Sequence, residues 1–207
     1  MKPTIYLALT HDWELRGDGS GDIEEIQFAP MRRLLEIYEK FGARTTFLPD
    51  VMQQVTFRNL ESAHPELKPL ADAWDEHALA AFRQGHDIQL HLHSQWSDAK
   101  YEGGRWSLRG EWSLLKYARE QTMRMLGESK SYLEDLLQPV QRDYRCVAFR
   151  ASALALAPSG NLLSTLLDLG IEIVVLAHEI GDHRIDVADL PALLLGAETV
   201  KQEKRIA

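Results

Sequence analysis

The feature of this 207-residue chain that most constrains its fold is the alternation of short apolar runs with amphipathic helical patterns. Apolar runs bounded by turn residues predict strands, and such runs occur at 4–12, 43–49, 87–93, 146–152 and 171–177. The connections between them are long enough for crossover helices, which favours right-handed βαβ units and parallel pairing. We therefore expect an α/β fold with a mostly parallel sheet or a (β/α) barrel.

The connecting segments support this expectation. Apolar residues recur at helical spacing in 29–42, 69–85, 112–137 and 158–170. Glycine closes the first two of these segments, as is typical of helix C-caps. The sequence has no repeat, low-complexity tract or linker, so we expect a single domain over residues 1–207.

The composition excludes several classes of protein. Hydrophobic residues make up 45% of the chain, enough for a core, and the net charge of −8 offers no basic surface to nucleic acid. The apolar run near the N-terminus lacks the features of a signal peptide, and no run approaches the roughly 20 apolar residues of a membrane span. We expect a cytoplasmic protein without membrane or nucleic-acid partners, and we expect the single Cys146 to be a buried, inert thiol.

Polar side chains gather at the ends of the predicted strands. In "GHDIQLHLHSQW" the alternation of a strand puts His91 and His93 on one face and Ile88, Leu90 and Leu92 on the other. In "LTHDWE" the same alternation puts Asp12 and Glu14 on one face. Parallel α/β folds carry their chemistry at the carboxyl ends of strands, where Arg150 also lies. We therefore expect these five side chains to meet.

Two imidazoles facing two carboxylates suit Zn²⁺ or another divalent first-row ion. Such an ion would polarise a carbonyl and acidify a water, while a free carboxylate takes the proton. Arg150 would keep that carboxylate ionised and oriented, because an opposite charge nearby favours the charged form. Simpler roles stay open: a strand histidine can be structural, Asp12 can cap the next turn, and Arg150 can form a plain ion pair.

The segment "QWSDAKYEGGRWSLRGEW", residues 95–112, is rich in aromatic residues and contains paired glycines. A loop of this kind at the mouth of a barrel suits a surface on which sugar rings stack. Trp96 and Trp106 are the substrate-binding candidates. The alternative is an apolar patch that holds the loop to the barrel.

Taken together and in this order, "LTHDWE", "GHDIQLHLHSQW" and "VAFRAS" resemble the polysaccharide deacetylase (NodB-homology) superfamily over roughly residues 4–180. The resemblance implies a distorted (β/α) barrel that removes acetyl groups from N-acetylated glycans with a divalent metal, commonly zinc. It implies Asp12 as the general base, Glu14 and His91 as metal ligands, and Arg150 as the residue that braces the base.

The chain departs from the family pattern in two places. The family's second metal histidine comes four residues after the first, where this chain has Gln95, so we assign that role to His93 and treat Gln95 as a weak oxygen ligand or a neighbour of the ligands. The family's Leu-x-His general acid is imitated by "VLAHE" with His178, but too early in the chain. We expect the C-terminal strands to be missing, which leaves an incomplete barrel that could self-associate through an open sheet edge.

Three functions follow from these observations. The first is a metal-dependent hydrolase that removes N-acetyl groups from a glycan. The second is a truncated, non-catalytic remnant of the same fold, and the third is a metal-free C–N hydrolase of the same superfamily. Metal content separates the third from the first, and turnover separates the second.

Overall fold

The computed structural model describes residues 8–152 and 160–175. Within them, parallel strands form two small sheets. The first sheet has the order β1 (Thr10–Trp13), β2 (Thr46–Pro49), β3 (Asp87–Ile88). The second has the order β4 (Leu90–Leu92), β7 (Ala148–Ala151), β8 (Ile173–Val174).

The two sheets continue one another. Only Gln89 separates β3 from β4, and an isolated parallel bridge between Asp50 and His91 joins the end of β2 to β4. The five runs expected to be strands therefore lie side by side in the order β1, β2, β3/β4, β7 and β8. The expectation of an α/β fold with parallel strands is confirmed. Closure into a barrel is not detected within the described residues, in which β1 and β8 form the two edges.

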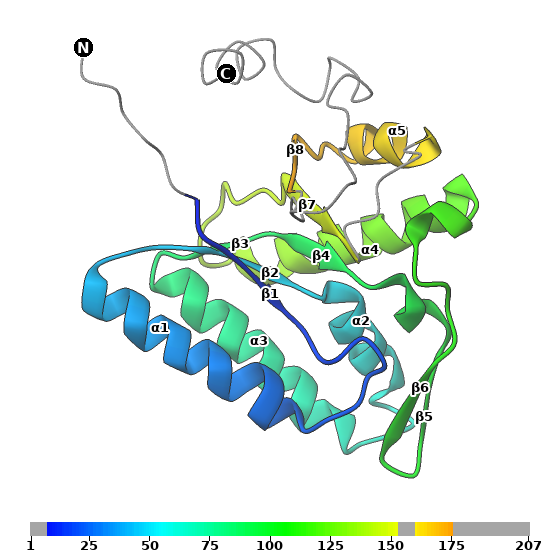
Figure 1. Ribbon diagram of the computed structural model, residues 1–207, viewed down its shortest axis with the longest axis horizontal. Coiled ribbons are helices and arrows are strands. Elements are labelled where there is room, and N and C mark those ends of the chain that lie inside the picture. The colour runs from blue at the N-terminus through cyan, green and yellow to red at the C-terminus, as the bar shows by residue number, and fades with distance from the viewer. Residues whose placement is uncertain (1–7, 153–159, 176–207) are drawn as a thin grey trace, which may run out of the picture.

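Four helices overlap the four helical patterns: α1 (Ala29–Phe41), α3 (Leu67–Arg83), α4 (Arg119–Leu137) and α5 (Gly160–Asp168). Helix α4 begins at Arg119 rather than at residue 112, because Leu114–Lys116 forms a separate 3₁₀ helix. Gly42 ends α1 in the left-handed conformation, at φ 61°, which glycine adopts without strain. Figure 1 shows α1 and α3 side by side along the first sheet, while α4 packs beside β4 and α5. None of the helices in the described part of the chain is both long enough and apolar enough to cross a bilayer.

The structure also contains a helix and a hairpin that the periodicity does not predict. Helix α2 (Val51–Leu60) follows β2 directly and lies between α3 and α4. The antiparallel strands β5 (Ala99–Glu102) and β6 (Arg105–Leu108) form a hairpin. Its turn residues Gly103 and Gly104 both have positive φ, as a tight two-residue hairpin turn requires. The hairpin extends beside α2, away from the sheets (Figure 1).

Candidate metal site

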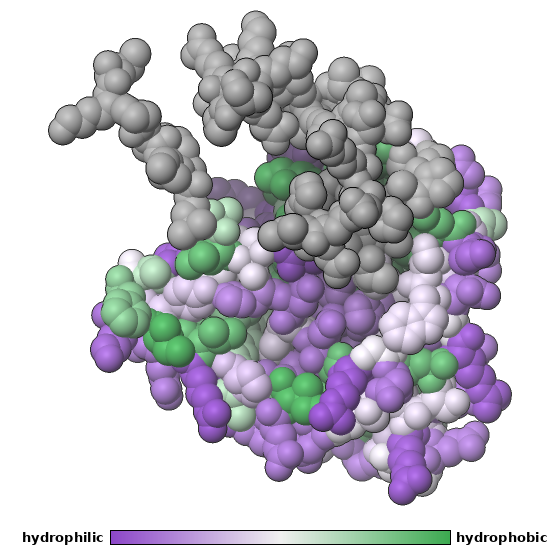
Figure 2. All heavy atoms as spheres, in the orientation of Figure 1, coloured by the Kyte–Doolittle hydropathy of each residue, from purple (hydrophilic) through white to green (hydrophobic). Residues whose placement is uncertain are grey.

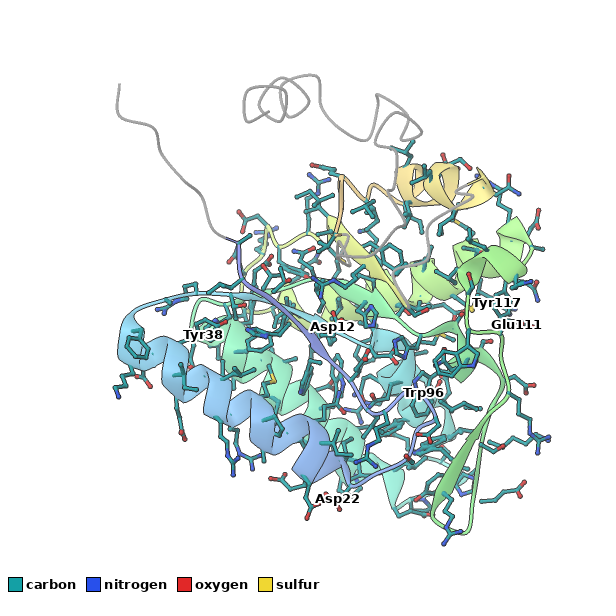
Figure 3. All side chains as sticks on the ribbon, viewed as in Figure 1. Asp12, Asp22, Tyr38, Trp96, Glu111 and Tyr117 are labelled. Atoms are coloured by element: carbon teal, nitrogen blue, oxygen red, sulfur yellow. The ribbon has the colours of Figure 1, made fainter. Side chains whose placement is uncertain are left out.

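The end of β1 is held in place by the buried side chain of Trp13. Its ring lies 4.9 Å from that of Trp74 in the core, and its indole Nε1 donates a hydrogen bond to the carbonyl of Gln27 at 2.9 Å. Because successive side chains alternate, Asp12 and Glu14 on either side of Trp13 leave the core face together. Figure 3 shows Asp12 on β1 near the middle of the molecule, and hydrophilic residues gather around the middle of the same face in Figure 2.

The two histidines come from the end of β4. His91 lies beside Arg150 in the parallel register of β4 and β7, and its Nδ1 donates to the carbonyl of Arg150 at 2.8 Å. That bond leaves Nε2 of His91 free to face Glu14. His91 and His93 are both buried, with ring centroids 4.8 Å apart. They point to the same side of the strand, as their spacing predicts.

Glu14, His91 and His93 converge on one point. Oε2 of Glu14 lies 2.8 Å from Nε2 of His91 and 3.1 Å from Nε2 of His93. The potential ligand atoms of the three residues all lie within 4.8 Å of one another. The expectation that these side chains meet is confirmed for both histidines and for Glu14.

Glu14 and His91 shift each other's pKa. Burial raises the pKa of Glu14, but the hydrogen bond with His91 and the charges of His93, His91 and Arg150 outweigh it, so the pKa is lowered overall. Burial lowers the pKa of His91, but the hydrogen bond with Glu14 and the nearby carboxylates outweigh it, so that pKa is raised overall. The site therefore favours an ionised carboxylate and a positive charge beside it.

This donor set fits a divalent metal. Two imidazole nitrogens and one carboxylate oxygen form the His₂Glu set that is found at catalytic zinc sites. His91 also has the supporting bond that metal-binding histidines typically make, since its second ring nitrogen is held by a backbone carbonyl. Glu14, His91 and His93 could therefore hold a cation such as Zn²⁺.

Asp50 is a site residue that the sequence reasoning missed. It follows β2 directly and is fully buried, and burial raises its pKa. Its Oδ1 accepts a hydrogen bond from the backbone N–H of His93 at 3.1 Å, and its Oδ2 lies 3.7 Å from Nδ1 of His93. Its position at the carboxyl end of a predicted strand was the signal that could have found it.

Asp12 pairs with Arg150 across the strand ends. Nη1 of Arg150 lies 2.5 Å from Oδ1 of Asp12, and Nη2 donates to Oγ1 of Thr10 at 2.6 Å. The pairing agrees with the sequence prediction, and the arginine rather than the carboxylate is the buried member. The side chain of Asp12 is 38% exposed and that of Arg150 only 10%. The reason is that Asp12 projects from an edge strand, while Arg150 lies on the inner strand β7.

Gln95 does not continue the strand. It lies in the short 3₁₀ helix Ser94–Asp98, and its Nε2 donates to the carbonyl of Gly17 at 2.9 Å. The amide thus fastens the loop that follows β1, while its Oε1 is buried without a hydrogen-bond partner in the described residues.

Trp96 and Trp106 belong to an aromatic cluster that fastens the hairpin to α2. Trp96 is 3% exposed, which contradicts its assignment to a sugar-binding surface and agrees with the packing alternative. Trp106 stacks on Phe57 at 5.0 Å and keeps part of its surface exposed. Figure 3 shows Trp96 inside the molecule on the side of the hairpin.

His86 does not belong to the group formed by Glu14, His91 and His93. His86 is 3% exposed, and its Nδ1 accepts a hydrogen bond from the backbone N–H of Thr45 at 3.3 Å. It is buried because the chain turns inward as soon as α3 ends. His178, considered as a general acid, lies outside the described residues.

No protein-family model and no curated protein matches the sequence. Solved structures match over most of the chain. A family 4 carbohydrate esterase from Streptomyces lividans, in complex with acetate, aligns with a TM-score of 0.50 at 14% identity, covering 82% of this chain and 62% of that one. A putative polysaccharide deacetylase from Mycobacterium smegmatis aligns with a TM-score of 0.46 at 16% identity, covering 84% and 55%.

A mutant of the peptidoglycan deacetylase PdaC from Bacillus subtilis aligns with a TM-score of 0.41 at 12% identity, covering 96% of this chain and 91% of that one. At these identities the likeness concerns the fold alone, and of these three alignments the one with the esterase has the highest TM-score. The chain has the mixed α/β fold of the CE4 polysaccharide deacetylases, whose barrel is distorted. It spans about 62% of the length of the esterase.

Proposed function

We propose that this chain is a metal-dependent amide hydrolase that removes N-acetyl groups from a glycan. The observation that carries the proposal is the convergence of Glu14, His91 and His93 at the strand ends, beside the pair formed by Asp12 and Arg150. The fold of a family 4 carbohydrate esterase supports it, and so does the resemblance of the three sequence motifs to polysaccharide deacetylases.

Glu14, His91 and His93 would hold a divalent ion, for which Zn²⁺ is the best fit to two nitrogens and one oxygen. Such an ion, when bound, supplies a positive charge that polarises the amide carbonyl and makes a nearby water more acidic.

Asp12 would take the proton of the attacking water. Its Oδ1 is engaged by Arg150, which fixes the orientation of the carboxylate and leaves Oδ2 to accept the proton. Arg150 is itself fixed by its bond to Thr10, so the base is held between two strands. This arrangement reduces the reorganisation that proton transfer would otherwise require.

The glycan would lie on the surface next to the metal ligands and Asp12, beside Trp112. The ring of Trp112 lies against Gly17, and its backbone carbonyl accepts a hydrogen bond from Ser152, which follows β7. Trp112 is therefore held between the loop after β1 and the end of β7, and it is 57% exposed. An exposed indole in this position suits stacking on a sugar ring.

A second surface that could bind the glycan lies between the loop after β1 and the hairpin. A cleft of about 540 Å³ lies between the loop at 19–23, α2 and the hairpin, and it is lined in part by Leu15, Tyr101 and Trp106. Leu15 is the neighbour of Glu14 in the chain. Trp106 remains our substrate-binding candidate for flanking sugar units, whereas the buried Trp96 supports it from behind.

The test is acetate release from N-acetylglucosamine oligomers by the purified full chain. We expect release that is abolished by chelation, restored by Zn²⁺, and lowered by about 10²–10⁴-fold in Asp12→Asn, as for loss of a general base. Release that persists after chelation would favour the metal-free hydrolase. A chain that binds metal but releases no acetate would favour the non-catalytic remnant.

A further inference from the structure

The first turn of α2 contacts both strands that supply the metal-site residues. The carboxyl group of its N-cap residue, Asp50, accepts a hydrogen bond from the backbone N–H of His93, and its Oδ2 lies 3.7 Å from Nδ1 of the His93 ring. The backbone N–H of Asp50 also donates to the carbonyl of Trp13 at 3.1 Å. One residue therefore links the ends of β1 and β4, which carry Glu14 and the histidines.

Gln53, three residues after Asp50 in α2, also bonds to the chain next to Glu14. Its Oε1 accepts the backbone N–H of Leu15 at 3.2 Å, and its Nε2 donates to Oε1 of Gln27 at 2.9 Å. Gln27 in turn donates its own amide to the carbonyl of Trp13 at 3.2 Å. Both peptide groups that flank Glu14 are thus hydrogen-bonded to buried side chains.

The polar side chains that make these hydrogen bonds are almost completely buried. Asp50 is 1% exposed, and Gln53 and Gln27 are 0% and 1% exposed. Polar groups buried to this extent lower stability unless they are hydrogen-bonded, so their partners are strongly specified. The partners are the backbone on both sides of Glu14 and the backbone N–H of His93. Glu14 lies beyond the last residue of β1, where sheet pairing no longer fixes the chain.

We propose that Asp50 and Gln53 are positioning residues that pre-form the ligand geometry, with Asp50 orienting His93 and Gln53 fixing the backbone of Glu14. This inference rests on the proposed function in one respect only, namely that Glu14, His91 and His93 bind a divalent ion. It does not depend on which substrate is hydrolysed. Outer contacts of this kind typically contribute 10–100-fold to metal affinity.

The neighbouring glutamine provides a matched control. Gln54 is as buried as Gln53 and lies next to it in the same helix, but its Nε2 donates to Ala71, Asp75 and Tyr132 on the other side of α2. Gln53→Met and Gln54→Met remove the same chemical group from the same helix. Only the first change releases the backbone next to Glu14.

The experiment is a titration of the metal-free full chain with Co²⁺ and Zn²⁺, followed by absorption and by competition with a chelating dye. We expect Gln53→Met and Asp50→Asn each to weaken binding by about 10–100-fold and Gln54→Met to leave it unchanged. Asp50→Asn should also alter the Co²⁺ absorption spectrum, because the amide keeps the bond to the backbone of His93 but presents an NH₂ group to its ring in place of the carboxyl oxygen Oδ2. Melting temperatures and circular dichroism establish that each variant is folded.

Equal affinities for wild type, Asp50→Asn and Gln53→Met would overturn this inference and leave the proposed function standing. Equal weakening in Gln53→Met and Gln54→Met would also overturn it, since a general loss of helix stability would then explain both. A wild-type chain that binds no divalent ion would overturn the proposed function together with this inference. The expected affinities without acetate release would leave the inference standing and refute the hydrolase.

Discussion

Arg150 and Asp12 form an ion pair in which the cation is the buried partner. Nη1 of Arg150 lies 2.5 Å from Oδ1 of Asp12, but the aspartate side chain is 38% exposed and the arginine side chain 10%. Removing either residue therefore has a different consequence. Without Arg150, the carboxylate of Asp12 is still solvated. Without Asp12, the guanidinium stays buried, and Thr10 is the side-chain hydrogen-bond partner that it keeps among the described residues.

We expect Asp12→Ala to lower the free energy of unfolding by about 2–3 kcal/mol, somewhat less than for a fully buried pair. Arg150→Met should lower it by less than about 1 kcal/mol, because it removes the buried charge altogether. Urea unfolding of the two variants measures the difference. A larger loss in Arg150→Met than in Asp12→Ala would contradict this account of the pair.

The tryptophans of residues 95–112 should separate into packing and substrate contacts. Trp96 is 3% exposed and packs edge-to-face against Phe57 and Trp106, so Trp96→Ala should cost about 3–5 kcal/mol of stability. Trp112 is 57% exposed. Trp112→Ala should leave stability nearly unchanged and raise KM for the glycan by roughly 2–10-fold, the value of one stacked ring.

Thermal unfolding and steady-state kinetics of the two variants test this division, with Ile37→Ala as a control because Ile37 is exposed on α1, away from the strand ends. If Trp112→Ala changes neither KM nor kcat, the glycan does not stack on Trp112. If Trp96→Ala is folded and as stable as the wild type, the aromatic cluster does not hold the hairpin.

Cys146 should be unreactive in the folded chain. Burial raises the pKa of its thiol from an ordinary value of 9.0 to about 12, so the native protein carries no thiolate near neutral pH. Labelling with a disulfide reagent at pH 8 should therefore require unfolding. Rapid labelling of the native chain would show that the thiol of Cys146 is accessible, which would contradict its burial in the core.

The same shift predicts a dependence of stability on alkaline pH. Between pH 9 and pH 12 the unfolded chain loses the thiol proton while the folded chain keeps it, so the unfolded state binds fewer protons. The free energy of unfolding must then fall as the pH rises through this window. Cys146→Ala should remove part of that slope, measured by urea unfolding between pH 8 and pH 11, whereas an unchanged slope would mean that Cys146 does not titrate abnormally.

Much of the strand arrangement could be predicted from the sequence because the signal is local. The two-residue alternation of His91 and His93, and of Asp12 and Glu14, depends only on the geometry of an extended chain. The rule that parallel strands carry chemistry at their carboxyl ends then brings these residues together without any long-range information.

Helix α2 could not be predicted in this way. The first seven residues of α2, Val51 to Phe57, are all buried although three of them are polar, so apolar and polar residues do not separate onto two faces of the helix. Missing α2 also concealed Asp50, whose role as N-cap depends on a helix beginning after β2. The hairpin was within reach, since the pair Gly103-Gly104 between alternating residues is a recognised turn signal.

The burial of single side chains was the hardest property to predict. Trp96 and Trp106 lie in the same aromatic-rich segment, so the sequence does not distinguish them. In the structure Trp96 packs against Phe57 and Trp106, whereas Trp106 borders a cleft. His86 is buried for a similar reason, since its surroundings come from distant segments such as Tyr38 and Phe47. Such contacts join residues far apart in the chain and leave no pattern in the local sequence.

The most direct test of the central claim is the position of a bound ion in crystals of the full chain soaked with Zn²⁺. An anomalous difference map collected at the zinc edge should show one strong peak in contact with Oε2 of Glu14 and Nε2 of both His91 and His93, at bond lengths of about 2.0–2.2 Å. The peak should disappear in Glu14→Ala. The absence of a peak among these three residues, or a peak that persists there in Glu14→Ala, would contradict the account.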